Sequence, residues 1–246
     1  MSEEKRVAIV TGSSSGIGES VARTLAARGI RVVVNSARSR DAGERIAAQL
    51  PDALYLQADI ADEQQATRLV VDTLERFGRL DILVNNAGTT RFIPHQDLDA
   101  ATGDVWREIL GVNVIGTWQT TVAAVPALRE SGSGAIVNIS SVAGQRPAGS
   151  SIPYAVSKAA VSHLTRLLAK TLGPAIRVNA VAPGLIDTPW TAGQSGFAEI
   201  AEHVRAGTPL RRVGTPEDVA HVVAALVDAE YLTGEVVHVD GGAQLI

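Results

Sequence analysis

Cysteine is absent from this chain of 246 residues, and methionine occurs once. Without cysteine the protein has no disulfide, no thiolate nucleophile and no cysteine-ligated metal. The five histidines are His95, His163, His203, His221 and His238, and no two of them have the close spacing of metal ligands. We therefore expect no metal site, and we interpret the histidines as structural or surface residues.

Long apolar runs and blocks of positive charge are also missing. No stretch reaches the about 18–20 apolar residues that span a membrane, so we expect no membrane partner. The formal net charge is -4, and a nucleic-acid surface needs clustered lysine and arginine, so we expect no nucleic-acid partner either. The opening MSEEKR passes directly into VAIV without the pattern of a signal peptide, and a cytoplasmic location is our expectation.

What the sequence does contain is a regular alternation of short apolar runs and helical patterns. No low-complexity linker and no internal repeat interrupts it. The alternation predicts an α/β fold, with one domain over residues 1–246: a Rossmann-type, doubly wound parallel sheet of about seven strands with helices on both faces. The expected strands are residues 7–10, 32–34, 54–56, 82–84, 135–139, 177–182 and 236–239.

The segment from about residue 185 to residue 210 departs from this rhythm, because its apolar pattern is weak. Ligands of open α/β sheets bind beyond the carboxyl ends of the strands, and this segment follows such an end. A mobile substrate lid is one interpretation, and a plain surface insertion is the other. Trp190 and Phe197 favour a mainly apolar pocket, unless they pack in the core. Upstream, a single long helix is expected between Asp104 and Leu128.

A glycine-rich loop follows the first expected strand. The stretch TGSSSGIG, residues 11–18, places Gly12, Gly16 and Gly18 in the spacing G-x-x-x-G-x-G. Glycine permits a tight turn and close approach of the backbone to a pyrophosphate, and the N-terminus of the following helix attracts anionic phosphate. The loop therefore indicates a dinucleotide site.

The end of the second expected strand indicates which dinucleotide is preferred. A carboxylate there hydrogen-bonds the ribose hydroxyls of NAD, whereas arginine accommodates the 2′-phosphate of NADP. The sequence is VVVNSARS, with Asn35, Ser36 and Arg38 and no acid at the tip. We therefore predict that NADP(H) is preferred and that NAD(H) is possible. The alternative interpretation is that Arg38 is simply solvated.

The stretch YAVSK, residues 154–158, puts Tyr154 and Lys158 four residues apart, on one face of a helix. A phenol has a pKa near ~10, and a nearby positive charge lowers that pKa by favouring the phenolate. The pair is thus a candidate general acid/base, although tyrosine and lysine also occur at this spacing by chance on helix surfaces.

Seven motifs follow one another in order along nearly the whole chain. They are TGSSSGIG, NNAG at 85–88, Asn113 in VNVIG, NISS at 138–141, YAVSK, PGLIDT at 183–188 and VDGG at 239–242. Together they resemble the short-chain dehydrogenase/reductase family, and within it the members that act as 3-oxoacyl-acyl carrier protein reductases.

The resemblance implies a role for each candidate catalytic residue. Tyr154 would be the general acid/base, and Lys158 would lower its pKa and bind the nicotinamide ribose. Ser141 would hydrogen-bond the substrate oxygen, and its neighbour Ser140 would be structural. Asn113 would hold a water that links Lys158 to bulk solvent.

The resemblance also implies a set of cofactor-binding residues. Asp59 would contact adenine with Ile60 beside it, Ile186 and Thr188 would touch the nicotinamide carboxamide, and Asn85 would line the cofactor and support the sheet. The full set expected to bind the cofactor is Gly12, Ser14, Ser15, Gly16, Ile17, Gly18, Asn35, Ser36, Arg38, Asp59, Ile60, Asn86, Ala87, Gly88, Tyr154, Lys158, Pro183, Gly184, Ile186 and Thr188.

Three functions compete on this evidence. The first is an NADP(H)-dependent ketoreductase or alcohol dehydrogenase that takes a small carbonyl compound or secondary alcohol. The second is a 3-oxoacyl-acyl carrier protein reductase of fatty acid synthesis. The third is a regulator that senses dinucleotide without turnover, and a pure binder has no need of Ser141, Tyr154 and Lys158 together.

Two expectations about partners follow. Carrier proteins are acidic, and the stretches 128–135 and 170–177 that resemble the region facing the carrier contain few cations. Acyl carrier protein is therefore a possible partner but not the favoured one. The resemblance also implies a homotetramer, paired through the helices that carry Asn113 and Tyr154 and through the last strand near Val236.

Overall fold

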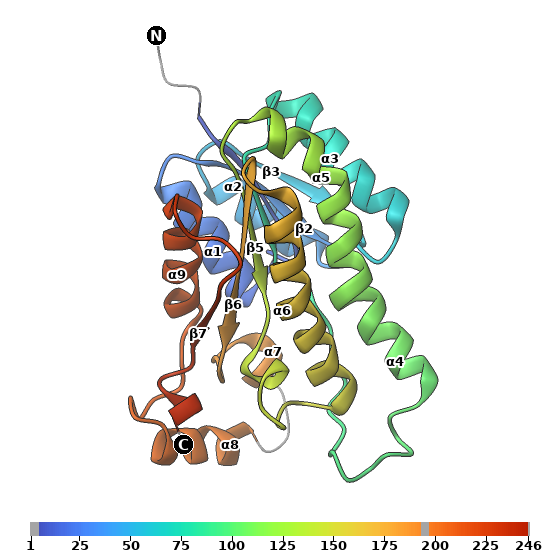
Figure 1. The fold of residues 1–246 in the computed structure, drawn as a ribbon, viewed down its shortest axis with the longest axis vertical. Helices are drawn as coiled ribbons and strands as arrows, with labels where there is room; N and C mark the ends of the chain where they lie inside the picture. The colour runs from blue at the N-terminus through green and yellow to red at the C-terminus, as the bar shows by residue number, and fades with distance from the viewer. Residues whose placement is uncertain (1–4, 193–196, 246) are drawn as a thin grey trace.

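A parallel sheet of seven strands forms the centre of the molecule (Figure 1). The computed structural model describes residues 5–192 and 197–245. The strand order is β3-β2-β1-β4-β5-β6-β7, and every neighbouring pair is parallel. The order reverses between β1 and β4, where open α/β sheets bind ligands. The predicted fold class is confirmed. The strands are β1 (Val7–Val10), β2 (Arg31–Ser36), β3 (Ala53–Gln57), β4 (Ile82–Asn85), β5 (Gly134–Ile139), β6 (Ile176–Pro183) and β7 (Val236–Val239).

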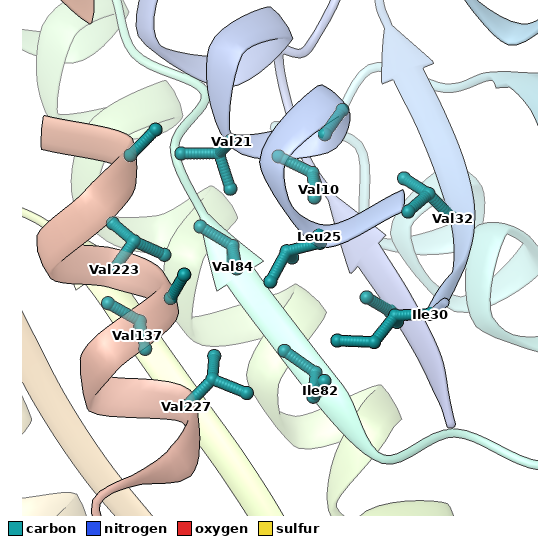
Figure 2. Packing of buried hydrophobic residues seen from close by; sticks show 14 of the residues in the cluster. Val10, Val21, Leu25, Ile30, Val32, Ile82, Val84, Val137, Val223 and Val227 are labelled. Carbon is teal, nitrogen blue, oxygen red and sulfur yellow. The ribbon is translucent and has the colours of Figure 1, made fainter. Parts of the chain in front are cut away.

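Helices cover both faces of the sheet, which is why the central strands β1, β4 and β5 are buried along their whole length. Figure 2 shows one face, on which Val21 and Leu25 of α1 and Val223 of α9 lie among Val10 and Val84 of the sheet. The elements of this face are α1 (Gly16–Ala27), α2 (Arg40–Gln49) and α9 (Pro216–Asp228). The opposite face packs against α3 (Glu63–Phe77), α5 (Thr117–Glu130) and α6 (Ile152–Leu172).

The single helix expected between Asp104 and Leu128 is divided in the structure. Two helices, α4 (Gly103–Leu110) and α5, are joined by a π-helical stretch at Gly111–Gly116. The prediction was right about the extent of the helical stretch and wrong about its regularity. A π-turn closes i→i+5 hydrogen bonds and so redirects the side chains around it, and such turns are frequent at functional sites. Here it buries Asn113.

The segment after β6 contains two helices that the sequence did not predict. They are α7 (Pro189–Ala192) and α8 (Phe197–Gly207), and both lie beyond the carboxyl end of the sheet, at the lower end of Figure 1. Gly193 and Gly196 lie outside the described residues, as does the side chain of Phe197. The interpretation of this segment as a lid stays a prediction. Among the described residues no helix has the length and apolar character of a transmembrane span.

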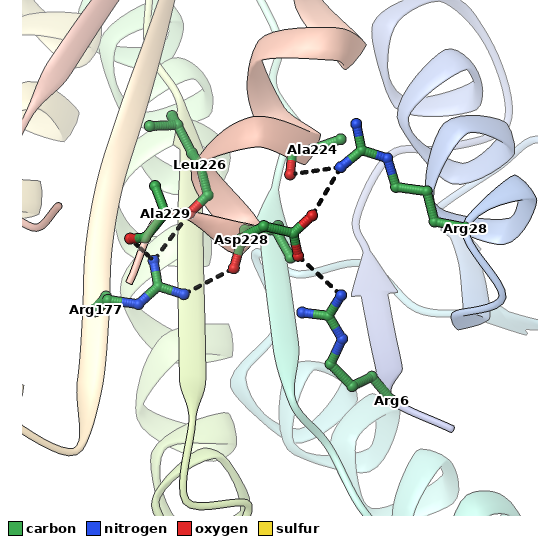
Figure 3. Close-up of polar contacts among 8 residues, drawn as sticks. Arg6, Arg28, Arg177, Ala224, Leu226, Asp228 and Ala229 are labelled. Atoms are coloured by element: carbon green, nitrogen blue, oxygen red, sulfur yellow. Dashed lines mark hydrogen bonds and ion pairs between the residues drawn. The ribbon is translucent and has the colours of Figure 1, made fainter. Parts of the chain in front are cut away.

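At the opposite, amino end of the sheet, arginines hold the last turn of α9 (Figure 3). Arg177 of β6 donates to the carbonyls of Leu226, Val227 and Ala229 at 2.7–2.9 Å. The Asp228 carboxylate pairs at 2.9 Å with arginines that precede β1 and follow α1, namely Arg6 and Arg28. The final turn of a helix leaves its carbonyls unpaired, and here guanidinium groups from distant elements supply the missing donors.

Candidate active site

A cavity of about 1190 Å³ opens at the carboxyl edge of the sheet, around the point where the strand order reverses. Every residue expected from the sequence to bind cofactor lines it, and so do Ser141, Tyr154 and Lys158. Asn113 is not in the wall but directly behind it. Four segments that are distant in the sequence therefore meet here: the glycine loop, the end of β2, the start of α6 and the segment after β6.

The start of α6 places the Tyr154–Lys158 pair. Ser151 is the N-cap residue, and its hydroxyl accepts a hydrogen bond from the Tyr154 N–H at 3.3 Å. Pro153 follows in the first turn, where its missing N–H costs nothing. Tyr154 and Lys158 thus lie one turn apart on the face that looks into the cavity, with the Lys158 Nζ 5.7 Å from the centre of the tyrosine ring. The predicted helix and its face are confirmed.

Burial raises the pKa of the Tyr154 phenol, and a hydrogen bond from the Ser141 hydroxyl counteracts this rise by favouring the phenolate. Ser141 lies at the end of β5 and is itself nearly buried. Its position is held by the short helix that it begins, since its Oγ accepts a hydrogen bond from the Ala143 N–H at 3.2 Å. The phenol is therefore protonated at neutral pH, and the hydrogen bond from Ser141 opposes the burial that makes it a weaker acid.

Lys158 is the charged member of the pair, and burial lowers its pKa to about 8. Its Nζ donates to the Ile139 carbonyl at 2.8 Å, on the strand that leads to Ser141. The sequence predicted that Lys158 lowers the pKa of Tyr154. In the structure the ammonium points at this carbonyl, and the groups that shift the pKa of Tyr154 are its apolar surroundings and Ser141.

Asn113 joins the π-helical stretch to the catalytic segments. Its Oδ1 accepts from the Thr89 N–H at 2.7 Å, and its Nδ2 donates to the Thr89 carbonyl and to the Ser157 hydroxyl. The side chain is therefore a brace between the loop after β4 and α6. The water that Asn113 was expected to hold stays a prediction.

The glycine loop packs tightly against the NNAG stretch. Gly12 and Gly16 have positive φ angles of 62° and 56°, which strain residues other than glycine. A Cβ at Gly12 would lie 2.7 Å from the Ala87 Cα, and a Cβ at Gly18 would lie 2.4 Å from the Asn86 Nδ2. The three glycines are thus required by the turn and by the close approach of the two loops.

The N-terminus of α1 is left open toward the cavity. Its N-cap residue Ser15 makes no side-chain hydrogen bond to the first turn, whereas Asp62, Thr102 and Ser151 cap α3, α4 and α6 in that way. Unpaired N–H groups and the positive end of the helix dipole suit an anion. The residues present therefore fit the pyrophosphate of a dinucleotide.

The three residues at the end of β2 that were expected to select the cofactor differ in their contacts. Asn35 is buried, and its amide is engaged on both sides: the Nδ2 donates to carbonyls at the end of β3, and the Oδ1 accepts from the Gly12 N–H. Its side chain positions the glycine loop. Ser36 has its Oγ 2.9 Å from the Tyr55 hydroxyl. Arg38 is exposed at the cavity wall and forms no ion pair with any described residue.

The remaining expected cofactor residues occupy the cavity wall in two groups. Asp59 and Ile60 follow β3, and one Asp59 carboxylate oxygen accepts from the Ala61 N–H. Pro183, Gly184, Ile186 and Thr188 follow β6. A Cβ at Gly16 would lie 3.4 Å from the Thr188 Cγ2, so the segment after β6 reaches across the opening to the glycine loop.

Asn85 differs from expectation, because it does not line the cavity. It is the last residue of β4, and its amide is buried beneath the sheet, where it donates to the Asn138 Oδ1 at 2.9 Å and to the Thr121 Oγ1. Strand alternation turns consecutive side chains to opposite faces, so only its neighbours after the strand reach the cavity.

Several residues in the wall of the cavity or behind it were not among the catalytic and cofactor-binding residues expected from the sequence. Thr11 has its hydroxyl accept from the N–H groups of Asn86 and Ala87, which ties the glycine loop to NNAG. Trp190 of α7, one of the two aromatic residues that favoured an apolar pocket, lines the cavity edge-on to Tyr154, with ring centres 6.2 Å apart. Side chains of the loop after β4 also line the substrate end, and among them are Thr90, Phe92, Ile93, Pro94, His95 and Gln96.

Metal ligands do not gather at this site. Within residues 5–192 and 197–245 no three histidine or carboxylate side chains come together as a metal would require.

A doubly wound sheet with an open helix N-terminus, and with serine, tyrosine and lysine at its carboxyl edge, defines a dinucleotide-dependent dehydrogenase or reductase acting on CH–OH groups. The chain belongs to the short-chain dehydrogenase/reductase family. The family model described as enoyl-(acyl carrier protein) reductase matches residues 12–244. The family assignment and the enzymatic class predicted from the sequence are confirmed, and the purely regulatory alternative is set aside.

Similar proteins cover this chain almost completely. A protein of Streptomyces violaceoruber assigned as ketoacyl reductase 2 of the granaticin polyketide synthase is 67% identical over 99% of this chain and 98% of its own length. A 3-oxoacyl-[acyl-carrier-protein] reductase of Synechocystis is 37% identical over 96% of each chain. The crystal structure of levodione reductase matches with a TM-score of 0.88 and 34% identity, covering 98% of each chain.

Proposed function

We propose that this protein is an NADPH-dependent ketoreductase that converts a ketone of a ketoacyl compound into a secondary alcohol. The observation that carries the proposal is the half-buried Tyr154 phenol, hydrogen-bonded to Ser141 and facing the cavity. The phenol is protonated at neutral pH, so it holds the proton that reduction of a ketone requires.

The residues of the site divide the work of reduction. A bound NADPH supplies the hydride that adds to the carbonyl carbon. The carbonyl oxygen gains negative charge as the hydride adds, and Ser141 donates a hydrogen bond to it while Tyr154 transfers its proton. Lys158 provides a positive charge 5.7 Å from the ring centre, which stabilises the phenolate that remains.

The preference for NADP(H) over NAD(H) is part of the proposal. It is supported by Arg38, which lies exposed near Ser36 without an ion pair to any residue that the structure describes, and by the absence of a carboxylate at positions 35, 36 and 37. We expect kcat/KM to be at least about tenfold higher with NADPH than with NADH, and Ser36→Asp to reverse this order through repulsion of the 2′-phosphate. Steady-state kinetics with both cofactors test it, and equal values for the wild type would contradict it.

The identity of 67% with the granaticin ketoacyl reductase supports a ketoacyl substrate. The expectation that carrier-free ketones are better substrates than carrier-bound chains stays a prediction, supported by the scarcity of cations in the cavity wall, where Arg38 and Lys158 are the only ones among the described residues. The second candidate, a carrier-bound 3-oxoacyl chain, is favoured by the name of the Synechocystis relative.

One kinetic comparison separates these two candidates. It measures kcat/KM with NADPH for a ketoacyl chain on acyl carrier protein, for the same chain on a small thioester, and for a cyclic ketone. We expect the carrier to add less than about tenfold. A carrier advantage of about a hundredfold that fades at high salt would overturn the prediction and establish the second candidate.

The homotetramer is also proposed. Large apolar side chains are exposed along the π-helical stretch, α5 and α6, namely Ile115, Trp118, Val122, Val156 and Leu167. Exposed apolar patches of this kind mark protein interfaces, and these helices are the ones that the family resemblance pairs. We expect light scattering to give the mass of four chains. A stable monomer at micromolar concentration would exclude the tetramer.

A further inference from the structure

Tyr55 contacts the cofactor site from outside its wall. It lies on β3 opposite Val34 of β2, and strand alternation therefore puts its side chain on the same face of the sheet as Ser36. The hydroxyl groups of Tyr55 and Ser36 are 2.9 Å apart, and either can be the donor. Ser36 lines the cavity, whereas Tyr55 does not, so any influence of Tyr55 on a ligand passes through Ser36.

The Tyr55 ring is fixed by a glycine of α2. A Cβ at Gly43 would lie 2.1 Å from the Tyr55 Cε2 and 2.4 Å from its Cδ2, so the ring rests directly on the helix backbone. Any larger residue at position 43 would displace it. The phenol oxygen is therefore held in place before a ligand arrives.

The groups around this hydroxyl pair favour an anion. Arg38 is exposed at the cavity wall without an ion-pair partner among the described residues. Ser39, at the N-terminus of α2, makes no side-chain cap, so the first turn of that helix also presents open N–H groups. Arg40, the first residue of α2, is paired with Glu44 at 2.8 Å.

We propose that Tyr55 is a positioning residue for the 2′-phosphate of NADP(H), and that it acts by donating a hydrogen bond from its hydroxyl group to the Ser36 Oγ. The inference rests on the proposed NADP(H) preference. Two hydroxyl groups in contact carry two protons, and one of these protons forms the hydrogen bond between the two oxygens. Phosphate oxygens in the dianion only accept hydrogen bonds, so they select the arrangement in which Tyr55 donates to Ser36 and Ser36 donates outward. Hydrogen bonds in such a chain strengthen one another.

Calorimetric binding of 2′,5′-ADP and of 5′-AMP tests the proposal without turnover. The proteins are wild type, Tyr55→Phe, Ser36→Ala and the double variant, with Tyr231→Phe as the matched control, since Tyr231 is fully exposed. We expect Ser36→Ala to weaken 2′,5′-ADP by about 10- to 100-fold and Tyr55→Phe by about three- to tenfold, with 5′-AMP unchanged. In the Ser36→Ala background, Tyr55→Phe should have no further effect.

The outcomes separate this inference from the proposed function. Wild-type protein that binds both nucleotides equally would overturn the NADP(H) preference, and the inference with it. If the wild type prefers 2′,5′-ADP, three results would overturn the inference alone: Tyr55→Phe leaves both affinities unchanged, it weakens both equally, or its effect persists in full beside Ser36→Ala.

Discussion

The two ends of the sheet use similar side chains in opposite ways. At the amino end, Arg177 donates hydrogen bonds to the last carbonyls of α9 (Figure 3). At the carboxyl end, Arg38 is exposed without an ion-pair partner among the described residues, and the N-terminus of α1 lacks a side-chain cap. One end satisfies its polar groups within the protein, and the other leaves them for a ligand.

The difference is clearest between two neighbouring helices. α9 is closed at both ends: Thr215 and Asp218 form a capping box at its start, and Arg177 closes its last turn. α1 packs beside α9 in the same hydrophobic cluster, but its first turn opens onto the cavity. Completed hydrogen bonds contribute stability, whereas unpaired donors contribute binding energy only when an acceptor arrives.

The largest expected effect is on catalysis at the carboxyl end of the sheet. Tyr154→Phe removes the proton donor and should lower kcat by roughly 10²- to 10⁴-fold. The affinity for NADPH, measured by fluorescence titration, should remain close to the wild-type value, because the glycine loop and the β2 tip are untouched. A variant that keeps near-full turnover would rule out Tyr154 as the acid.

The second effect concerns Lys158 and depends on pH. Its pKa falls from 10.5 in the unfolded chain to about 8 in the folded protein, so below pH 8 both states carry the charge and its burial destabilises the fold. The unfolded state binds more protons between these values, so stability rises with pH there. The advantage of Lys158→Met over wild type in free energy of unfolding should therefore shrink by about 3 kcal/mol between pH 7 and pH 10.5.

Urea unfolding of the cofactor-free protein at several pH values measures this change. The exposed Lys170→Met is the matched control and should show no comparable pH dependence of the difference. A Lys158→Met advantage that stays constant across the range would mean that the lysine is not desolvated as the structure indicates.

The smallest of the three effects is expected at the amino end of the sheet, where Arg177 binds the last turn of α9. Arg177→Met leaves the carbonyls of the last turn of α9 without donors and should lower the free energy of unfolding by about 2–3 kcal/mol. Because this end is remote from the cavity, kcat/KM should stay within about twofold of wild type. The exposed Arg129→Met serves as control and should change neither quantity. A large loss of activity in Arg177→Met without loss of stability would break the division between the two ends.

Local patterns were sufficient for much of the site. The three glycines of the loop and the Tyr154–Lys158 spacing are constraints between residues close in the chain, so they could be interpreted before any fold was known. The roles of Ser141 and Asn113 needed the family resemblance, because they come from other elements. Tyr55 could not be found in this way: its spacing from Ser36 has meaning only when β2 and β3 lie side by side in one register.

The sequence by itself determined the alternation of strands and helices, the glycine turn and the helix face that carries the phenol and ammonium. Each depends on backbone preferences and on residues at most a few positions apart. Tertiary structure alone decided the π-turn that buries Asn113, the contact of Trp190 with Tyr154, and the burial that raises the pKa of the phenol. It also decided that Arg177, Arg6 and Arg28 bind the end of α9, whereas Arg38 lies exposed at the cavity wall. Burial and hydrogen-bond partnership depend on which distant segments meet, and only the folded chain sets that.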